Sequence, residues 1–155
     1  MKIDLIWIGK TQEKHVTEGV NEFISRIQRF ISFNIVEIKA IKKKVSEQEL
    51  KKLEAKELLN VLKAYDKVII LDENGEAMDS VAFSKEISRD MNKSYKQICF
   101  VIGGAYGFEK TVYIKADKKI SLSKMTMNHQ LVRLVFVEQL YRAYTIINNL
   151  PYHHS

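Results

Sequence analysis

Apolar residues along this chain form two kinds of pattern, which alternate from one end to the other. Short runs rich in branched and aromatic residues are typical of strands, and apolar positions three or four residues apart are typical of amphipathic helices. The runs cover residues 2–8, 33–41, 67–71, 97–102 and 119–122. The helical stripes cover residues 11–30, 46–62, 79–91, 108–116 and 131–147. This alternation predicts an α/β fold, with a mostly parallel sheet and helices on both faces.

Several element boundaries carry signals of their own. Ser46 with Glu49 fits a capping box, in which side chains satisfy free N–H groups at a helix start. Asp79 or Ser80 is expected to open the third helix. Residues 72–75, Asp-Glu-Asn-Gly, are typical of a turn, so the third strand is expected to end before them.

A chain of 155 residues without linker, internal repeat or low-complexity segment is expected to form one domain, residues 1–155. A domain of this size can bury its core without disulfide or metal. The single Cys99 excludes an internal disulfide and a multi-cysteine metal cluster, and its apolar neighbours indicate a buried, inert thiol. His153 and His154 have no ligand companions nearby, so no metal site is expected.

The N-terminal apolar run, Leu5 to Ile8, is too short for the core of a signal peptide. No other segment approaches the length of a membrane span. The sequence therefore predicts a soluble, cytoplasmic protein with no membrane partner.

Positive charge is unevenly distributed along the chain. Residues 1–90 hold 16 Lys and Arg against 16 Asp and Glu, whereas residues 91–155 hold nine against three, so the net +6 falls in the last part. A cationic surface attracts polyanions and phosphorylated ligands. A mildly basic, merely solubilising surface is the alternative.

Two of the predicted strands run into segments with candidate chemistry. One ends in the glycine loop, residues 103–107, and the other in residues 121–129, a junction rich in hydroxyl groups that precedes the last helix. In an open parallel sheet such loops converge at one edge, where ligands collect. The glycine loop lacks the spacing of dinucleotide and phosphate loops, so it is expected to let backbone approach a flat ligand closely. The alternative is a pair of ordinary turns.

The last helix and its start carry the remaining candidates. His129 could be a general base, a cationic donor or a structural residue. Arg133 and Arg142 lie on an otherwise apolar helix and are expected to pair with a carboxylate such as Glu138 or to serve an interface. Because this helix is apolar over most of its circumference, it favours a homodimer interface.

Along its entire length the chain resembles the RlmH family of SPOUT-class RNA methyltransferases. The matching pieces include the opening strand that ends at Gly9, the strand end at Leu71-Asp72 and the loop from Ile102 to Gly107. The most specific match is the string from Ser121 to Arg133, together with the pieces that follow it. These are Glu138-Gln139-Leu140-Tyr141-Arg142-Ala143 and Pro151-Tyr152-His153.

The resemblance implies a C-terminal trefoil knot, in which the chain threads through a loop. It implies that S-adenosylmethionine binds in the knot and that two subunits pack through this region. The family methylates N3 of a pseudouridine in helix 69 of 23S rRNA on the assembled ribosome, and the same reaction is expected here.

The resemblance also assigns residues by position. Leu71 would contact the cofactor, and Gly103 and Gly104 would let backbone approach its adenosine. The rest of the cofactor site would be the segment Leu122, Ser123, Lys124, Met125, Thr126, Met127 and Asn128. His129, Arg142 and His153 would be catalytic. Arg133, Tyr152 and His154 would contact the RNA. Four of these six residues would lie toward the substrate cleft, where they could face the partner subunit: His129, Arg142, Tyr152 and His153.

Two positions depart from the family's pattern. Asn128 stands where the family has Pro, and since Asn can adopt cap geometry the turn is expected to survive. His154 stands where the family has Lys or Arg, so a phosphate contact there would be weaker and pH-dependent.

Methyl transfer to an imide nitrogen requires positioning and the loss of the N3 proton. His129 or His153 is expected to be the base, and Arg142 to stabilise charge on the neighbouring carbonyl groups. The family lacks a large RNA-binding domain, so recognition is expected to rest on a basic cleft of the dimer and on the shape of the ribosome. The protein is therefore expected to methylate isolated rRNA poorly.

Two other functions remain open on the sequence alone. One is a non-catalytic, dimeric RNA- or ribosome-binding module with the same fold. The other is a different nucleotide-binding α/β protein in which the glycine loop cradles a phosphate. Binding of S-adenosylmethionine, of ATP or of neither distinguishes the three.

Overall fold

The computed structural model describes residues 1–154, in which five strands alternate with five helices. The strands are β1 (Lys2–Ile8), β2 (Ser32–Ile38), β3 (Lys67–Ala77), β4 (Gln97–Ile102) and β5 (Lys118–Ser121). The helices are α1 (Lys14–Ile27), α2 (Glu47–Leu62), α3 (Ser80–Met91), α4 (Lys110–Lys115) and α5 (Leu131–Ile147). The predicted alternation is confirmed for every element.

The strands form one sheet in the order β2-β1-β4-β3-β5, and every neighbouring pair in it is parallel. The predicted α/β class is thus confirmed, and the sheet is parallel throughout the described residues rather than mostly so. Parallel pairing directs all five strand carboxyl ends to the same edge. The middle of β3 after Leu71 and the loops after β4 and β5 therefore meet at that edge.

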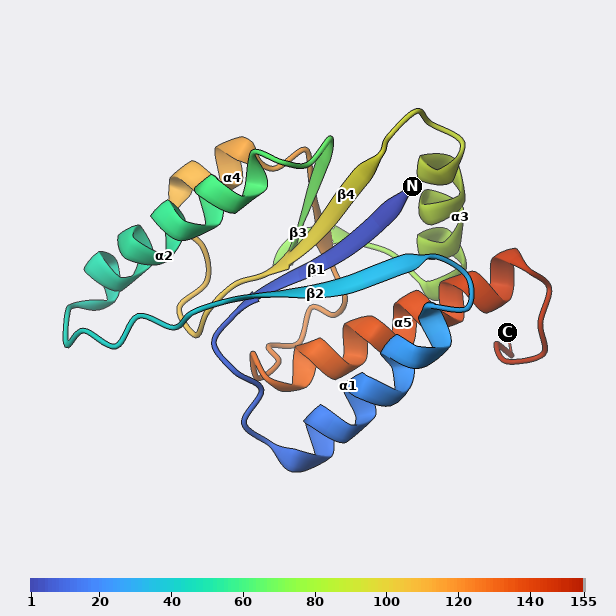
Figure 1. Ribbon diagram of the computed structural model, residues 1–155, viewed down its shortest axis with the longest axis horizontal. Helices are drawn as coiled ribbons and strands as arrows, with labels where there is room; N and C mark the ends of the chain where they lie inside the picture. Colours follow the sequence, from blue (N-terminus) through green and yellow to red (C-terminus); the bar gives the residue numbers. More distant parts are fainter. Residues whose placement is uncertain (155) are drawn as a thin grey trace.

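Helices cover both faces of the sheet (Figure 1). Helices α1, α3 and α5 pack on one face, and α2 and α4 pack on the other. The strands serve both layers because successive side chains point to opposite faces. In β1, for example, Ile3, Leu5 and Trp7 join the core under α5, whereas Ile6 and Ile8 join the core under α2.

Cys99 lies in this second core and is completely buried. Burial raises the pKa of its thiol, because a thiolate would lose its hydration there. The predicted burial of this cysteine is confirmed.

Two helix starts are capped by the residues that the sequence indicated. The Ser46 hydroxyl accepts a hydrogen bond from the Glu49 N–H at 3.2 Å, and the Asp79 carboxylate accepts one from the Ala82 N–H at 2.7 Å. Asp79, rather than Ser80, is therefore the cap of α3.

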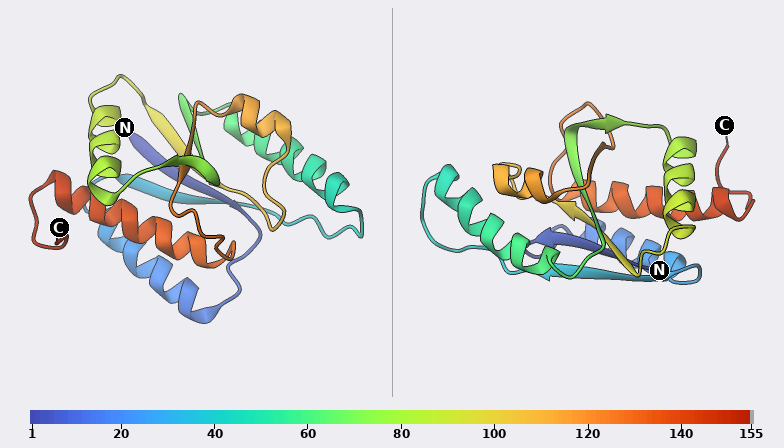
Figure 2. Two further views of the ribbon diagram at one scale, coloured as in Figure 1. Left: turned by 180° about the vertical axis from the view of Figure 1, so that it is seen from behind. Right: turned by 90° about the horizontal axis from the view of Figure 1, so that it is seen from above.

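The predicted end of the third strand is wrong, since β3 continues through the expected turn to Ala77. Leu71 and Glu76 both pair with Ile120, and the register shifts between them. Gly75 lies so close to this strand that a Cβ there would stand 2.7 Å from the Ile120 carbonyl carbon. The end of β3 thus crosses over β5, as Figure 2 shows in green against orange. The trefoil knot stays a prediction, and this crossing is the feature that favours it.

A buried ion-pair network ties the start of β3 to its neighbours. The Lys67 ammonium contacts Asp90 of α3 at 2.7 Å and Glu86 at 3.4 Å, and Lys118 of β5 contacts Glu86 at 3.1 Å. Asp90 is fully buried. Buried charges are tolerated only when paired, so this network fixes how α3 is docked.

Candidate active site

A cavity of about 420 Å³ opens where β4 and β5 end and where β3 shifts its register after Leu71. This is the volume of a pocket for a small molecule. Three segments supply most of its walls, namely residues Leu71 to Asn74 in the middle of β3, residues Ile102 to Phe108 at and after the end of β4, and the segment between β5 and α5. From this last segment and the start of α5 come Leu122, Ser123, Met125, Thr126, Met127, His129 and Val132.

The glycine loop has its shape for steric reasons. Gly107 has φ +78°, a left-handed conformation that favours glycine. At Gly104 a Cβ would stand 2.7 Å from a carboxylate oxygen of Glu54, which reaches the loop from α2. A Cβ at Gly103 would likewise stand 3.2 Å from the Phe108 ring. Side chains at Gly103 and Gly104 would therefore displace Phe108 or Glu54, so glycine at both positions lets the loop adopt this close packing.

Hydroxyl and amide side chains organise the segment before α5. The Met125 N–H donates to the Ser123 hydroxyl at 3.0 Å, and the Thr126 hydroxyl donates to the Glu73 carboxylate at 2.8 Å. Asn128 accepts a hydrogen bond from the Gln130 N–H at 2.7 Å. The turn predicted to survive with Asn128 is thus formed, and Gln130 is the residue that precedes the first turn of α5.

Two carboxylates give the cavity a negative side. Glu73 lies across from Thr126, and Asp72 accepts hydrogen bonds from the Tyr113 hydroxyl and, at 2.8 Å, from the Asn74 N–H. Burial and the bond to Asp72 raise the pKa of Tyr113, so this phenol stays protonated. A cavity with apolar walls and fixed carboxylates suits a ligand that is flat in one part and cationic in another.

His129 stands at the edge of the cavity in a half-buried position. Burial, and then the nearby Arg133 guanidinium, lower its pKa below the ordinary value of 6.5. Both causes disfavour the charged imidazolium. The imidazole is therefore neutral near pH 7, which is the form that accepts a proton.

Eleven of the predicted site residues occupy this one region, and nine of them line the cavity. Eight of the cofactor residues and His129 line the cavity; Lys124 and Asn128 lie on the same loop but outside the cavity wall. Sequence reasoning missed Glu73, Asn74, Tyr113 and Val132 as lining residues. The 72–75 turn was a signal for the first two. The sequence holds no comparable signal for Tyr113, which reaches the cavity from α4.

Arg133, predicted to contact RNA, is instead buried beneath the loop that joins β1 to α1. Its guanidinium donates to the carbonyl oxygens of Ile8 and Gly9, at 2.8 and 3.1 Å, and to the Thr11 hydroxyl at 2.9 Å. It also lies over the Trp7 ring, 4.6 Å from its centroid. Only 1% of the side chain is exposed, so in this fold Arg133 holds the loop in place and presents no surface to RNA.

Arg142, Tyr152 and His153 lie together, but at the other end of α5. Arg142 pairs with Glu138 at 3.1 Å, as expected, and contacts the His153 ring nitrogen at 3.2 Å. The Tyr152 hydroxyl donates to Glu138 at 3.0 Å, and Arg142 lies over its ring. His154 is exposed beside them. His129 lies just before α5 begins, whereas Arg142 lies eleven residues beyond the first residue of that helix, roughly 17 Å along its axis. One chain therefore does not bring its predicted catalytic residues together.

Residues 1–154 contain no group of three or more His, Cys, Asp or Glu side chains placed to hold a metal ion. Among the same residues no helix is long and apolar enough to cross a membrane.

Comparison with known proteins extends these observations. Residues 1–153 match a family model described as "Predicted SPOUT methyltransferase". The chain is 47% identical to the ribosomal RNA large subunit methyltransferase H of Flavobacterium johnsoniae and 46% identical to the protein of that name from Phocaeicola vulgatus. Both alignments cover 100% of this chain and 100% of the relative.

Solved structures with a similar fold are far more distant in sequence. The SpoU methyltransferase AviRb from Streptomyces viridochromogenes superposes with a TM-score of 0.52 at 11% identity over 96% of this chain. A probable methylase family protein from Haemophilus influenzae Rd KW20 superposes with a TM-score of 0.50 at 12% identity over 95% of this chain. The chain spans 61% and 66% of those two structures. These likenesses concern the fold alone.

Proposed function

The chain belongs to the SPOUT methyltransferase family, and on that premise we propose that it is an S-adenosylmethionine-dependent methyltransferase of large-subunit ribosomal RNA. The observation that carries the proposal is the convergence of Leu71, the glycine loop and residues 122–129 on one cavity. The full-length relatives named as ribosomal RNA large subunit methyltransferases support the choice of substrate.

The residues of the cavity fit the cofactor. Leu71, Ile102 and Leu122 offer an apolar surface to a purine, beside glycine backbone that permits close approach. Asp72 and Glu73 offer carboxylates to a ligand that carries both a sulfonium and an ammonium charge. When bound there, S-adenosylmethionine supplies an electrophilic methyl group.

The methyl acceptor in this proposal is N3 of a pseudouridine in helix 69 of 23S rRNA, within the assembled ribosome. The N3–H bond must break as the N3–CH₃ bond forms, and in this proposal His129 is the base that accepts the proton; its position at the edge of the cavity and its lowered pKa support that role. A poised base with a pKa near the working pH is typical of such proton transfers.

Arg142 and His153 join this chemistry only if a second copy of the chain supplies them. The proposal therefore includes a homodimer packed through α5, which places the far end of one α5 and its tail near the cavity of the other copy. The support is twofold. Arg142 and His153 lie at the wrong end of their own helix, and Leu131 of α5 is an exposed large apolar residue. A guanidinium there would stabilise negative charge on the base's carbonyl oxygens.

The decisive experiment is mass spectrometry of helix 69 nucleosides from cells with and without this gene. The proposal expects one N3-methylpseudouridine that disappears with the gene and returns when ribosomes are incubated with the protein and S-adenosylmethionine. Protein-free rRNA should be a poor substrate. An unchanged nucleoside, with calorimetric binding of ATP or of neither ligand, would instead support a nucleotide-binding protein or a non-catalytic ribosome-binding module.

A further inference from the structure

The lysines of α2 and of the loop before it form a charged surface that the proposed chemistry does not use. Between residues 39 and 63 the chain holds eight Lys against four Glu. One of these four, Glu54, is 8% exposed and turned toward Gly104, so it contributes little to the outer surface. We call the exposed set the lysine face, made of Lys42, Lys43, Lys44, Lys52, Lys56 and Lys63.

The spacing within α2 aligns these charges. Lys52, Lys56 and Lys63 are four and seven residues apart, which returns each to nearly the same side of a helix. The stripe is about 16 Å long at 1.5 Å per residue. The one carboxylate along it, Glu49, lies in the first turn, where negative charge favours the helix N-terminus.

No carboxylate neutralises the lysine face. Within residues 1–154, none of its six lysines comes within 4.0 Å of an Asp or Glu oxygen. Three cations elsewhere are used internally: Lys118 pairs with Glu86, Arg142 pairs with Glu138, and Arg133 is buried. The lysine face is therefore a place where positive charge is free to meet a polyanion, although the sequence placed the net charge in residues 91–155.

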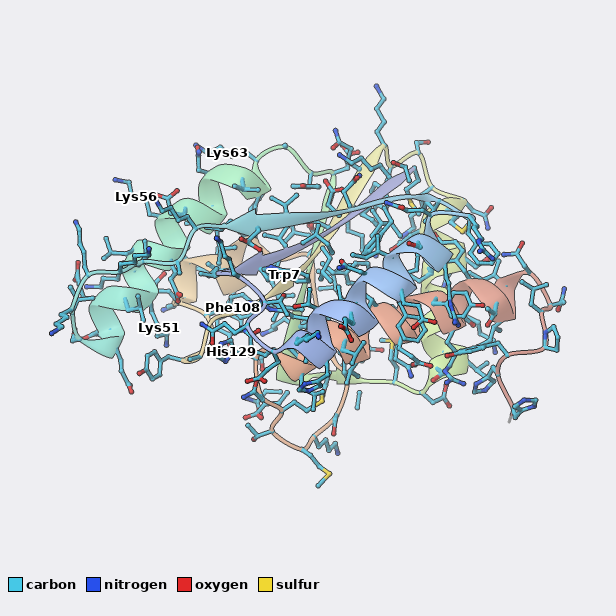
Figure 3. The ribbon with its side chains drawn as sticks, turned by 60° about the horizontal axis from the view of Figure 1, so that its bottom comes forward. Trp7, Lys51, Lys56, Lys63, Phe108 and His129 are labelled. Atoms are coloured by element: carbon cyan, nitrogen blue, oxygen red, sulfur yellow. The ribbon has the colours of Figure 1, made fainter. Side chains whose placement is uncertain are left out.

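The lysine face begins beside the active-site cavity. In a parallel sheet the N-terminus of α2 lies at the strand carboxyl edge, and Lys51 and Lys52 are close enough to influence the pKa of Glu109, just after the glycine loop. Figure 3 shows Lys51, Lys56 and Lys63 along α2, with Phe108 and His129 marking the neighbouring cavity. Because α2 covers the opposite face of the sheet from α5, a dimer formed through α5 leaves the lysine face open.

We propose that the lysine face binds the phosphate backbone of the ribosomal RNA next to the methylated nucleotide, and so orients the cavity on its target. This inference rests on the proposed function and extends it to a docking surface. Rows of lysine contact phosphate without reading sequence, fix register and make binding salt-dependent.

The test compares two triple variants of the full-length protein. The first is K52Q/K56Q/K63Q, and the matched control is K85Q/K93Q/K96Q, which removes three exposed lysines near α3. Binding to large ribosomal subunits is measured by filter retention from 50 to 300 mM KCl, with calorimetry of S-adenosylmethionine on each protein. Since each phosphate contact adds about 0.7–0.9 to the slope of log K against log salt, the first variant should lose about 2 from it.

The first variant should also raise KM for ribosomes by roughly tenfold at low salt, with kcat and cofactor affinity unchanged, while the control matches the wild type. An unchanged slope and KM would overturn the proposal. If the wild type binds subunits but does not methylate them, the proposed function fails and the slopes still decide this inference. If the wild type neither binds nor methylates the subunits, the proposed function and this inference both fail. Loss of binding to phosphatidylglycerol vesicles alone, with ribosome binding intact, would assign the face to membranes instead.

Discussion

At the scale of single residues, the cavity depends on contacts that allow no extra atom. Gly104 is the sharpest case, because Glu54 already occupies the place of its side chain. Gly104→Ala should displace the glycine loop and weaken S-adenosylmethionine binding at least tenfold, measured by calorimetry. The double variant Gly104→Ala/Glu54→Ala, which removes the obstructing carboxylate, should recover part of the affinity. Full affinity in the single variant would contradict this account of the loop.

His129 makes a prediction about pH. Its pKa is lowered by burial and by Arg133, so the neutral base predominates at pH 7 and above and is lost only as the pH falls below the ordinary value of 6.5. Single-turnover methylation of ribosomes should therefore be flat above about pH 7 and should decline in acid with the titration of His129. In His129→Gln the rate should fall on the order of a hundredfold or more and that acid limb should vanish. If the rate of His129→Gln still declines in acid in the same way, the base is another group.

At the scale of elements, Arg133 connects α5 to the loop between β1 and α1. Arg133→Met leaves the carbonyl groups of Ile8 and Gly9 without their buried donors, at a cost of roughly 3 kcal/mol in the free energy of unfolding. Arg89→Met, at a side chain that is 70% exposed, should change it by less than about 0.5 kcal/mol. Urea denaturation measures both. Equal, small effects would mean that Arg133 does not hold the loop.

The buried pair of Lys67 and Asp90 predicts a second large effect on stability. Asp90→Ala leaves an ammonium group in the core with only Glu86 at 3.4 Å, which should cost about 3–5 kcal/mol. The matched change Asp66→Ala removes an exposed carboxylate that accepts backbone hydrogen bonds, and should cost less. A smaller loss for Asp90→Ala than for Asp66→Ala would contradict the role given to the network.

The elements were also what the sequence predicted best. Apolar runs located all five strands, and they are nearly continuous in β1 and β4 because those two strands are buried on both faces. The pattern failed at β3, where turn residues 72–75 cross over β5 and the chain keeps pairing beyond them. The predicted RNA contact of Arg133 is wrong because a sequence does not show which cations are buried. Tyr113 was missed because its contact with Asp72 joins residues that are 41 apart.

At the scale of the whole molecule, the proposed dimer makes a quantitative prediction. If each active site combines His129 of one copy with Arg142 and His153 of the other, His129→Ala and Arg142→Ala protomers should complement each other. Statistical mixing gives half heterodimers, each with one intact site of two, so an equimolar mixture should recover roughly a quarter of wild-type activity. A mixture as inactive as its components would place all three residues in one subunit's site.

The crossing of β3 over β5 has a consequence for the way this protein is made. During translation the first four strands emerge before the residues that complete the cavity, since β5, the segment that follows it and α5 all belong to the last 38 residues. The crossing requires those residues to find their place against a loop that already exists. A nascent or truncated chain can therefore hold most of its sheet and still be unable to bind its ligand. The site is complete only once these late elements have joined the sheet.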